Sequence, residues 1–148
     1  MLRDVVNYTG IWANTVKEVI YFGGTVESDT KKPLNGNNTY LITFPKNSLP
    51  DSAVNAFWSI TLYSTPDFHV VKNSINKYGV NNVGNLQKNS DGSLSIWISP
   101  SLPKGVPQSN WIPSEKGKDF ALNLRMYVPK PEVLNGSWLP PEIKKIRQ

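Results

Sequence analysis

The sequence predicts a mainly β fold: an antiparallel, jelly-roll-like β-sandwich with a short N-terminal helix. Three observations support this fold class. About six to eight short runs are rich in aromatic and β-branched residues, and most alternate apolar with polar positions, as half-buried strands do. Glycine, proline and asparagine gather between these runs, where turns need them. The chain has 148 residues, with twelve prolines and ten glycines, which suits one domain with one core.

The first third of the chain predicts one helix and two strands. Apolar residues recur at roughly helical spacing over residues 2–14, where we expect the helix. Residues 19–22 form a strand signal, which Gly23-Gly24 interrupts and Thr25-Val26 resume. Residues 28–37 are turn-like and end in a hairpin signal, Asn-Gly. The next strand is expected over residues 38–44, since a proline follows them.

The clearest strand signal covers residues 56–63. Trp58, Ile60 and Leu62 would point to one face of a sheet, and the residues between them to the other. Both faces are partly apolar, which is typical of a strand with neighbours on both sides. We therefore expect a central strand of a layered structure here.

The middle of the chain alternates between strands and loops. Residues 68–71 predict a short strand, and residues 73–90 are rich in asparagine and glycine and predict a loop with short turns. Asp91-Gly92 is a further hairpin turn signal, followed by a strand over residues 93–99. Residues 100–113 are proline-rich and are expected to form a long loop.

The last part of the chain predicts one more strand and a cap. Residues 120–128 alternate in the manner of a strand, and residues 129–148 are bounded by prolines and predict the cap. No linker or internal repeat is visible. We therefore expect a single domain over 1–148, with the sandwich at about 18–128 behind the helix.

The charge gives little support to a nucleic-acid partner. The formal net charge is +5, but the basic residues are scattered except in the tail, at Lys144, Lys145 and Arg147. The chain has no cysteine, which excludes disulfides, thiol nucleophiles and thiolate metal sites.

Neither a membrane span nor a signal peptide is expected. No stretch approaches the roughly 20 apolar residues of a membrane helix. The first nine residues carry Arg3 and Asp4 and lack an apolar centre, unlike a signal peptide. The compartment, the ligand and the oligomeric state are left open by the sequence.

Several runs, taken in order along nearly the whole chain, are similar to a known family. They are PLNG at 33–36, NAFWSITLY at 55–63, DGSL at 91–94, NWIP at 110–113 and YVPK at 127–130. Their order resembles the domain-of-unknown-function 1214 family. The resemblance implies a jelly-roll-like β-sandwich, often carried behind a second uncharacterised domain, and it implies no reaction.

The chain departs from that family's pattern at one place. After Tyr78 the pattern usually has an acidic-basic pair, whereas this chain continues Gly79-Val80-Asn81-Asn82. A site that used the pair would be altered here.

Residues that carry catalytic chemistry are sparse. The only histidine, His69, would need an orienting acid such as Asp67 or Asp91 to act as a base, and an ordinary strand histidine is the simpler interpretation. Carboxylates for a glycosidase pair exist, among them Glu115 and Asp119, but the sequence does not bring them together. Nucleophile-elbow, phosphate-loop and calcium-loop motifs are absent. We therefore expect no catalytic residues, no metal site and no cofactor.

Aromatic and amide side chains are the better candidates for a ligand site. Tryptophan and tyrosine faces stack on apolar faces of sugars, and asparagine amides hydrogen-bond hydroxyl groups. The candidate ligand-binding residues are Asn73, Asn76, Tyr78, Asn110, Trp111 and Trp138. The alternative is that the tryptophans, including Trp58 and Trp97, fill the core or hold loops in place.

Three hypotheses for the function follow. The first is a non-catalytic binding or assembly module for a glycan or another protein subunit; by fold analogy alone, jelly rolls also build viral shells. The second is an enzyme, or enzyme subunit, whose site needs a partner domain. The third, a nucleic-acid binder, depends only on the net charge of +5.

Overall fold

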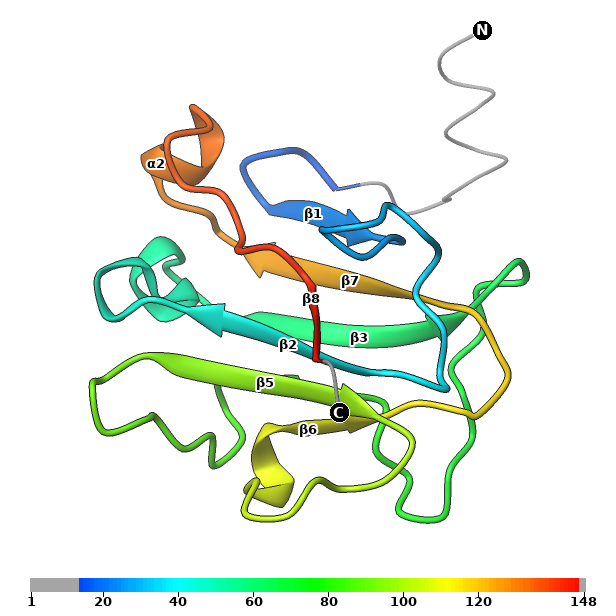
Figure 1. The fold of residues 1–148 in the computed structure, drawn as a ribbon. Coiled ribbons are helices and arrows are strands. Elements are labelled where there is room, and N and C mark those ends of the chain that lie inside the picture. Colours follow the sequence, from blue (N-terminus) through cyan, green and yellow to red (C-terminus); the bar gives the residue numbers. More distant parts are fainter. Residues whose placement is uncertain (1–13, 147–148) are drawn as a thin grey trace, which may run out of the picture.

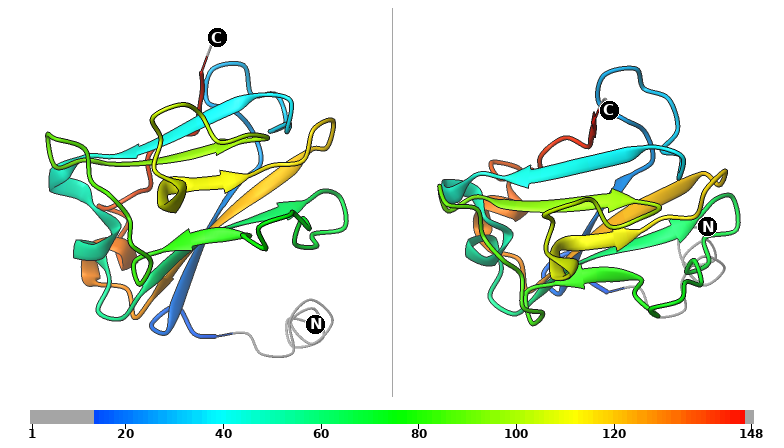
Figure 2. Two further views of the ribbon diagram at one scale, coloured as in Figure 1. Left: turned by 90° about the horizontal axis from the view of Figure 1, so that it is seen from below. Right: turned by 60° about the horizontal axis from the view of Figure 1, so that its bottom comes forward.

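Two four-stranded β-sheets face each other across a common core (Figure 1; Figure 2 shows the two layers from other sides). The computed structural model describes residues 14–146. Along this part of the chain the strands pass repeatedly from one sheet to the other. The mainly β fold class predicted from the sequence is confirmed. No helix among these residues is long and apolar enough to span a membrane.

The first sheet is antiparallel throughout. Its strands, in spatial order, are β1 (Val19–Gly24), β7 (Phe120–Tyr127), β3 (Trp58–Ser64) and β4 (Gly79–Asn81). The predicted alternation is confirmed in the two inner strands. Trp58, Ile60 and Leu62 of β3 are buried, as are alternate residues of β7 from Phe120 to Met126. These side chains form the inward face of the sheet.

The second sheet is mixed. Its strands, in spatial order, are β6 (Trp111–Pro113), β5 (Leu94–Ser99), β2 (Thr39–Phe44) and β8 (Lys144–Ile146). The β2–β5 and β2–β8 pairs are antiparallel, but β5 and β6 are parallel, so the expectation of a purely antiparallel structure is wrong at this pair. Parallel neighbours need a crossover of about a dozen residues. The proline-rich segment 100–110 supplies that crossover and ends in the short helix η3 (Gln108–Asn110).

Aromatic contacts connect the two sheets through the core. Tyr40 of β2 meets Phe120 of β7 edge to face, with ring centroids 5.8 Å apart. The ring centroids of Phe44 and Trp58, again from opposite sheets, lie 6.1 Å apart. All four side chains are buried. Edge-to-face aromatic pairs add to the stabilisation from burial.

The helices within the described part of the chain are short and lie between strands. They are η1 (Lys46–Ser48), η2 (Pro50–Ala53), η3 and α2 (Pro131–Leu134). α2 begins with proline, which suits the first helical turn. The N-terminal helix expected at residues 2–14 lies, apart from its last residue, outside the described residues.

The strand expected at residues 68–71 is absent. Phe68 has a φ of 53° and is 60% exposed, and its N–H donates to the carbonyl of Ser64, so the chain turns back here. Only Val70 forms an isolated bridge, with Tyr63. Local apolar character alone did not distinguish a turn from a strand.

Three strands lie where loops or a cap were expected. These are β4 within 73–90, β6 within 100–113 and β8 within the C-terminal cap. Each has three residues. Runs this short show no periodicity, and their pairing partners lie far away in the sequence.

Candidate functional site

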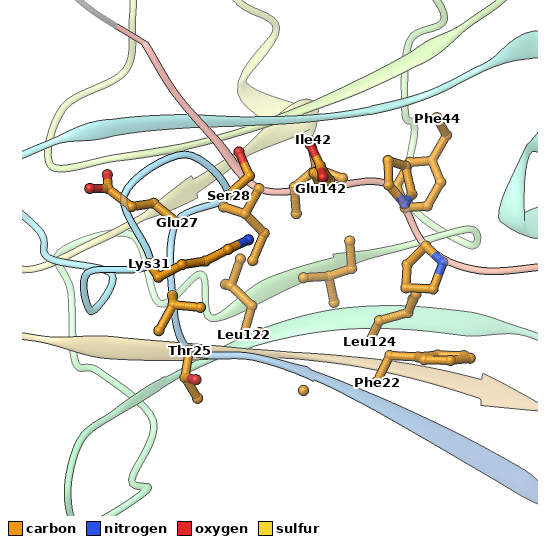
Figure 3. A pocket seen from close by; sticks show the side chains of 17 residues that line it. Phe22, Thr25, Glu27, Ser28, Lys31, Ile42, Phe44, Leu122, Leu124 and Glu142 are labelled. Atoms are coloured by element: carbon orange, nitrogen blue, oxygen red, sulfur yellow. The ribbon is translucent and has the colours of Figure 1, made fainter.

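A pocket opens between the two sheets, beside β1 and the last strand (Figure 3). Its volume is about 270 Å³. The floor consists of inward-facing side chains from both sheets: Phe22, Ile42, Phe44, Ile60, Leu122 and Leu124. Five of these are almost fully buried members of the core. The pocket therefore borders the core directly.

The segment 140–143, here called the strap, covers one side of this pocket. It runs from α2 toward β8 across the open side of the sandwich (Figure 1). The Ser28 N–H donates to the carbonyl of Ile143 at 3.0 Å. A Cβ at Gly24 would lie 2.4 Å from Cδ1 of Ile143, so the glycine makes room for this side chain. The strap is held by its last residue.

Residues 25–33, here called the rim loop, form another side of the mouth and meet the strap at Ser28. Backbone hydrogen bonds close it, from the N–H of Glu27 to Lys32 and from that of Lys31 back to Glu27. Lys31 has a φ of 58°, in the left-handed region that few residues other than glycine, asparagine and aspartate adopt. Figure 3 shows its side chain reaching from the rim loop into the pocket.

Glu27 is a buried carboxylate inside the rim loop. Only 3% of its surface is exposed. Oε1 accepts a hydrogen bond from the Thr30 hydroxyl, and Oε2 is buried without a hydrogen-bond partner. In Figure 3 this carboxylate turns away from the cavity, whereas the Lys31 amine turns toward it. The charged group that reaches into the cavity from the rim loop is therefore a cation.

The pocket suits binding better than catalysis. Its floor is apolar, and its mouth carries Lys31, the exposed Glu142, and the hydroxyls of Thr25 and Ser28. The lining residues include no histidine. A hydroxyl without an adjacent base is a weak nucleophile. The arrangement can hold an apolar group and present a cation to whatever polar group remains at the mouth.

A second pocket, of about 540 Å³, surrounds His69. Its lining is mixed, with the charged residues Asp67, Lys72 and Glu115 beside apolar ones. The Ser64 hydroxyl donates to Asp67 at 2.5 Å, and this bond is the main reason that the pKa of Asp67 is lowered. The hydroxyl is thus directed at a carboxylate rather than at the imidazole. Among residues 14–146, no group of three or more His, Asp or Glu could hold a metal ion.

Three of the candidate residues predicted from the sequence lie in one loop. Both polar atoms of the Asn73 amide bond to the backbone of the same loop, including Lys77 N–H at 3.0 Å and Lys77 C=O at 2.6 Å. Asn76 accepts a hydrogen bond from the Tyr78 hydroxyl at 3.3 Å. The Lys77 amine donates to the carbonyls of Gln108 and Ser109, and its burial lowers the pKa of this amine.

Two further candidates lie beside this loop, at the end of η3. Asn110 is 3% exposed; its amide nitrogen donates to Gln87 C=O at 2.7 Å and Ser95 C=O at 2.9 Å, and its oxygen accepts from Gln87 N–H at 2.8 Å. Trp111 is buried and donates its indole N–H to Ser99. The structure thus brings five of the six candidates to one side of the molecule. Most of their polar atoms make hydrogen bonds within the protein.

The sixth candidate, Trp138, lies elsewhere. It is 7% exposed and packs on Phe22 of β1, with ring centroids 6.0 Å apart. Trp58 is also buried, whereas Trp97 is half-buried. These indole rings fill the molecule, as the alternative interpretation expected. Whether any of the six residues contacts a ligand stays a prediction.

The residues of the inter-sheet pocket were not among the sequence candidates. Only residues 28–33 of the rim loop were interpreted as turn-like, and Gly23-Gly24 was interpreted as a break in the first strand, although β1 continues through both glycines. The one usable signal was this glycine pair, because a glycine inside a strand marks close approach of another segment. Nothing local indicated that the approaching segment would be the strap.

Comparisons with known proteins are informative about the fold. Among curated proteins, none matches this chain significantly. The crystal structure of the VPA0106 protein from Vibrio parahaemolyticus is similar over 95% of this chain, with a TM-score of 0.78 and 24% sequence identity. A putative uncharacterized protein from Burkholderia cenocepacia is similar over 98%, with a TM-score of 0.50 and 16% identity.

Both solved proteins are longer than this chain, which covers 34% of the first and 39% of the second. At these identities the likeness concerns the fold. The family resemblance predicted from the sequence is confirmed by a family model that matches residues 18–131. The chain belongs to the family described as "Protein of unknown function (DUF1214)".

Proposed function

We propose that this chain is a single-domain, non-catalytic binding module that takes a small apolar or amphipathic molecule into the pocket between its sheets. The observation that carries the proposal is the open core: six floor residues from both sheets face a cavity of about 270 Å³. Ligand pockets in proteins are concave, mostly apolar and fixed by a few polar groups. The jelly-roll connectivity expected from the sequence stays a prediction beside this proposal.

The apolar floor favours hydrocarbon over sugar. A glycan site needs exposed aromatic faces and free hydrogen-bonding groups, but Trp58, Trp111 and Trp138 are buried. The amide of Asn110 is fully hydrogen-bonded within the protein. Each methylene transferred from water to an apolar site contributes about 0.8 kcal/mol. The affinity should therefore depend on hydrocarbon length.

A series of straight-chain alcohols from butanol to decanol tests the proposal. We expect the dissociation constant, measured by calorimetry, to fall roughly fourfold for each added methylene. The gain should stop when the pocket is full. The cavity equals the volume of roughly nine water molecules at about 30 Å³ each, so the limit should lie near nine non-hydrogen atoms.

A filled pocket provides the control. Leu124→Phe places a larger side chain on the floor and should abolish alcohol binding, while the melting temperature shows that the variant folds. Leu86→Phe makes the same exchange at a half-buried residue that does not line this pocket, and should bind as the unmodified chain does. A flat response to every alcohol would refute the proposal and favour assembly with another protein subunit.

A further inference from the structure

Lys31 is the feature of the pocket that the apolar floor does not explain. A lysine on a surface loop ordinarily extends into water, because its ammonium group is strongly hydrated. Here the side chain is exposed but reaches from the rim loop across the mouth of the pocket (Figure 3). The apolar floor offers no hydrogen-bond acceptor to the ammonium group, so a bound anion could serve as its partner.

The backbone conformation of Lys31 is also unusual for a lysine. Its φ of 58° is a conformation that costs a non-glycine residue energy. The rim loop maintains it through the bonds Lys31 N–H to Glu27 C=O at 3.2 Å and Glu27 N–H to Lys32 C=O at 3.0 Å. Turns that need positive φ normally use glycine or asparagine. A lysine therefore occupies a position where glycine would be less strained.

The acidic groups near the pocket leave the Lys31 amine available. Glu27 directs one carboxylate oxygen to Thr30 and lies buried within the rim loop, turned away from the cavity. Glu142 is exposed on the strap. No other charged residue lines this pocket. A ligand anion at the mouth would accept hydrogen bonds from the Lys31 amine.

We propose that Lys31 selects an amphipathic carboxylate, whose hydrocarbon part occupies the apolar floor and whose carboxylate accepts hydrogen bonds from the Lys31 amine. This inference rests on the proposed function, because it needs the same pocket. The pocket size suits a chain of roughly eight carbons, by the volume of about 30 Å³ for each water-sized group. A charge-assisted hydrogen bond at a partly exposed mouth should favour the acid over the matching alcohol about tenfold.

The experiment compares octanoate with octanol at neutral pH by calorimetry. In the unmodified chain we expect octanoate to bind about tenfold more tightly. Lys31→Gln should remove that preference, because only octanoate loses a charged partner, whereas Lys31→Arg should keep it. Lys32→Gln, a charge-matched control at the neighbouring lysine, which does not line the pocket, should also keep the preference.

A glycine variant separates recognition from folding. Lys31→Gly relieves the left-handed strain, so its melting temperature should rise while the preference for octanoate disappears. Equal affinity of the unmodified chain for octanoate and octanol would overturn the role of Lys31 and leave the apolar pocket standing. Failure of both ligands to bind would refute the pocket and this inference together.

Discussion

Two sides of the molecule use their polar residues in opposite ways. On the asparagine-rich side, formed by the loop 73–78, η3 and the turn before β5, the amides of Asn73 and Asn110 bond to backbone groups. On the pocket side, formed by β1, the rim loop and the strap, core side chains face an open cavity and Lys31 reaches over them.

This difference shows that a residue type suited to binding a ligand is not enough, because its polar groups must also be free to contact that ligand. The asparagine-rich side contains the residue types that bind sugars, but a buried amide already hydrogen-bonded to backbone has little left for a ligand. The pocket side contains ordinary aliphatic residues. It is a candidate site because packing is incomplete there, whereas protein interiors are normally close-packed.

Replacing Asn110 should produce the largest effect. Asn110→Ala leaves three partly buried backbone groups of Gln87 and Ser95 without the Asn110 amide as their partner. Since each such hydrogen bond contributes about 1 kcal/mol, we expect a loss of about 3 kcal/mol in the free energy of unfolding, measured with urea. Asn85→Ala, at an exposed asparagine, should change it by less than about 0.5 kcal/mol. Equal, small losses would mean that the Asn110 amide is available to a ligand.

The sequence predicted the long strands better than the short ones. In β3 and β7 the alternation continues over seven and eight residues, long enough to define an inward face. β4, β6 and β8 have three residues each and form because a partner strand lies beside them. Asn35-Gly36 and Asp91-Gly92 do form turns, yet neither joins neighbouring strands.

The candidate site was less predictable than the fold for a related reason. A cavity depends on how completely segments from distant parts of the chain fill the space between them. No local sequence pattern specifies this packing. Gly24 is informative only together with Ile143, which the fold brings onto it. The family resemblance gave the fold and no ligand, so it offered no way to prefer the rim loop over the asparagines.

Adding a methyl group at Gly24 should have an intermediate effect. In Gly24→Ala the new Cβ would meet Cδ1 of Ile143 at 2.4 Å, the far end of a side chain that can rotate away. We expect a loss of about 1 kcal/mol in unfolding free energy and a wider mouth, seen as weaker discrimination of alcohol length. Gly23→Ala, with nothing within 4 Å of its Cβ, should be neutral or slightly stabilising. If both variants behave alike, the strap does not depend on Gly24.

Removing the charge of Asp91 should give the smallest effect and the one most sensitive to pH. The Ser93 hydroxyl donates to Asp91 at 2.6 Å and the Ser93 N–H at 2.9 Å, and these bonds, the hydroxyl first, lower the pKa of Asp91. A carboxylate whose pKa is lowered in the folded state stabilises it above the unfolded value of about 3.9, and this contribution is lost as the pH falls through the folded value. Asp91→Asn should therefore be less stable than the unmodified chain near pH 7. The difference should shrink below about pH 3.9, as urea titrations at several pH values would show.

Asp29→Asn, on the exposed part of the rim loop, serves as the control for removing one negative charge from a basic protein. If the Asp91 difference follows that of Asp29 at every pH, the effect is general charge rather than the turn. If only Asp91→Asn shows the pH-dependent loss of stability, the contrast between the two sides holds for their charged groups as well as for their amides. The carboxylate at the turn before β5 would then stabilise the fold, as the amides of that side do, while the charged Lys31 at the pocket mouth stays available to a ligand.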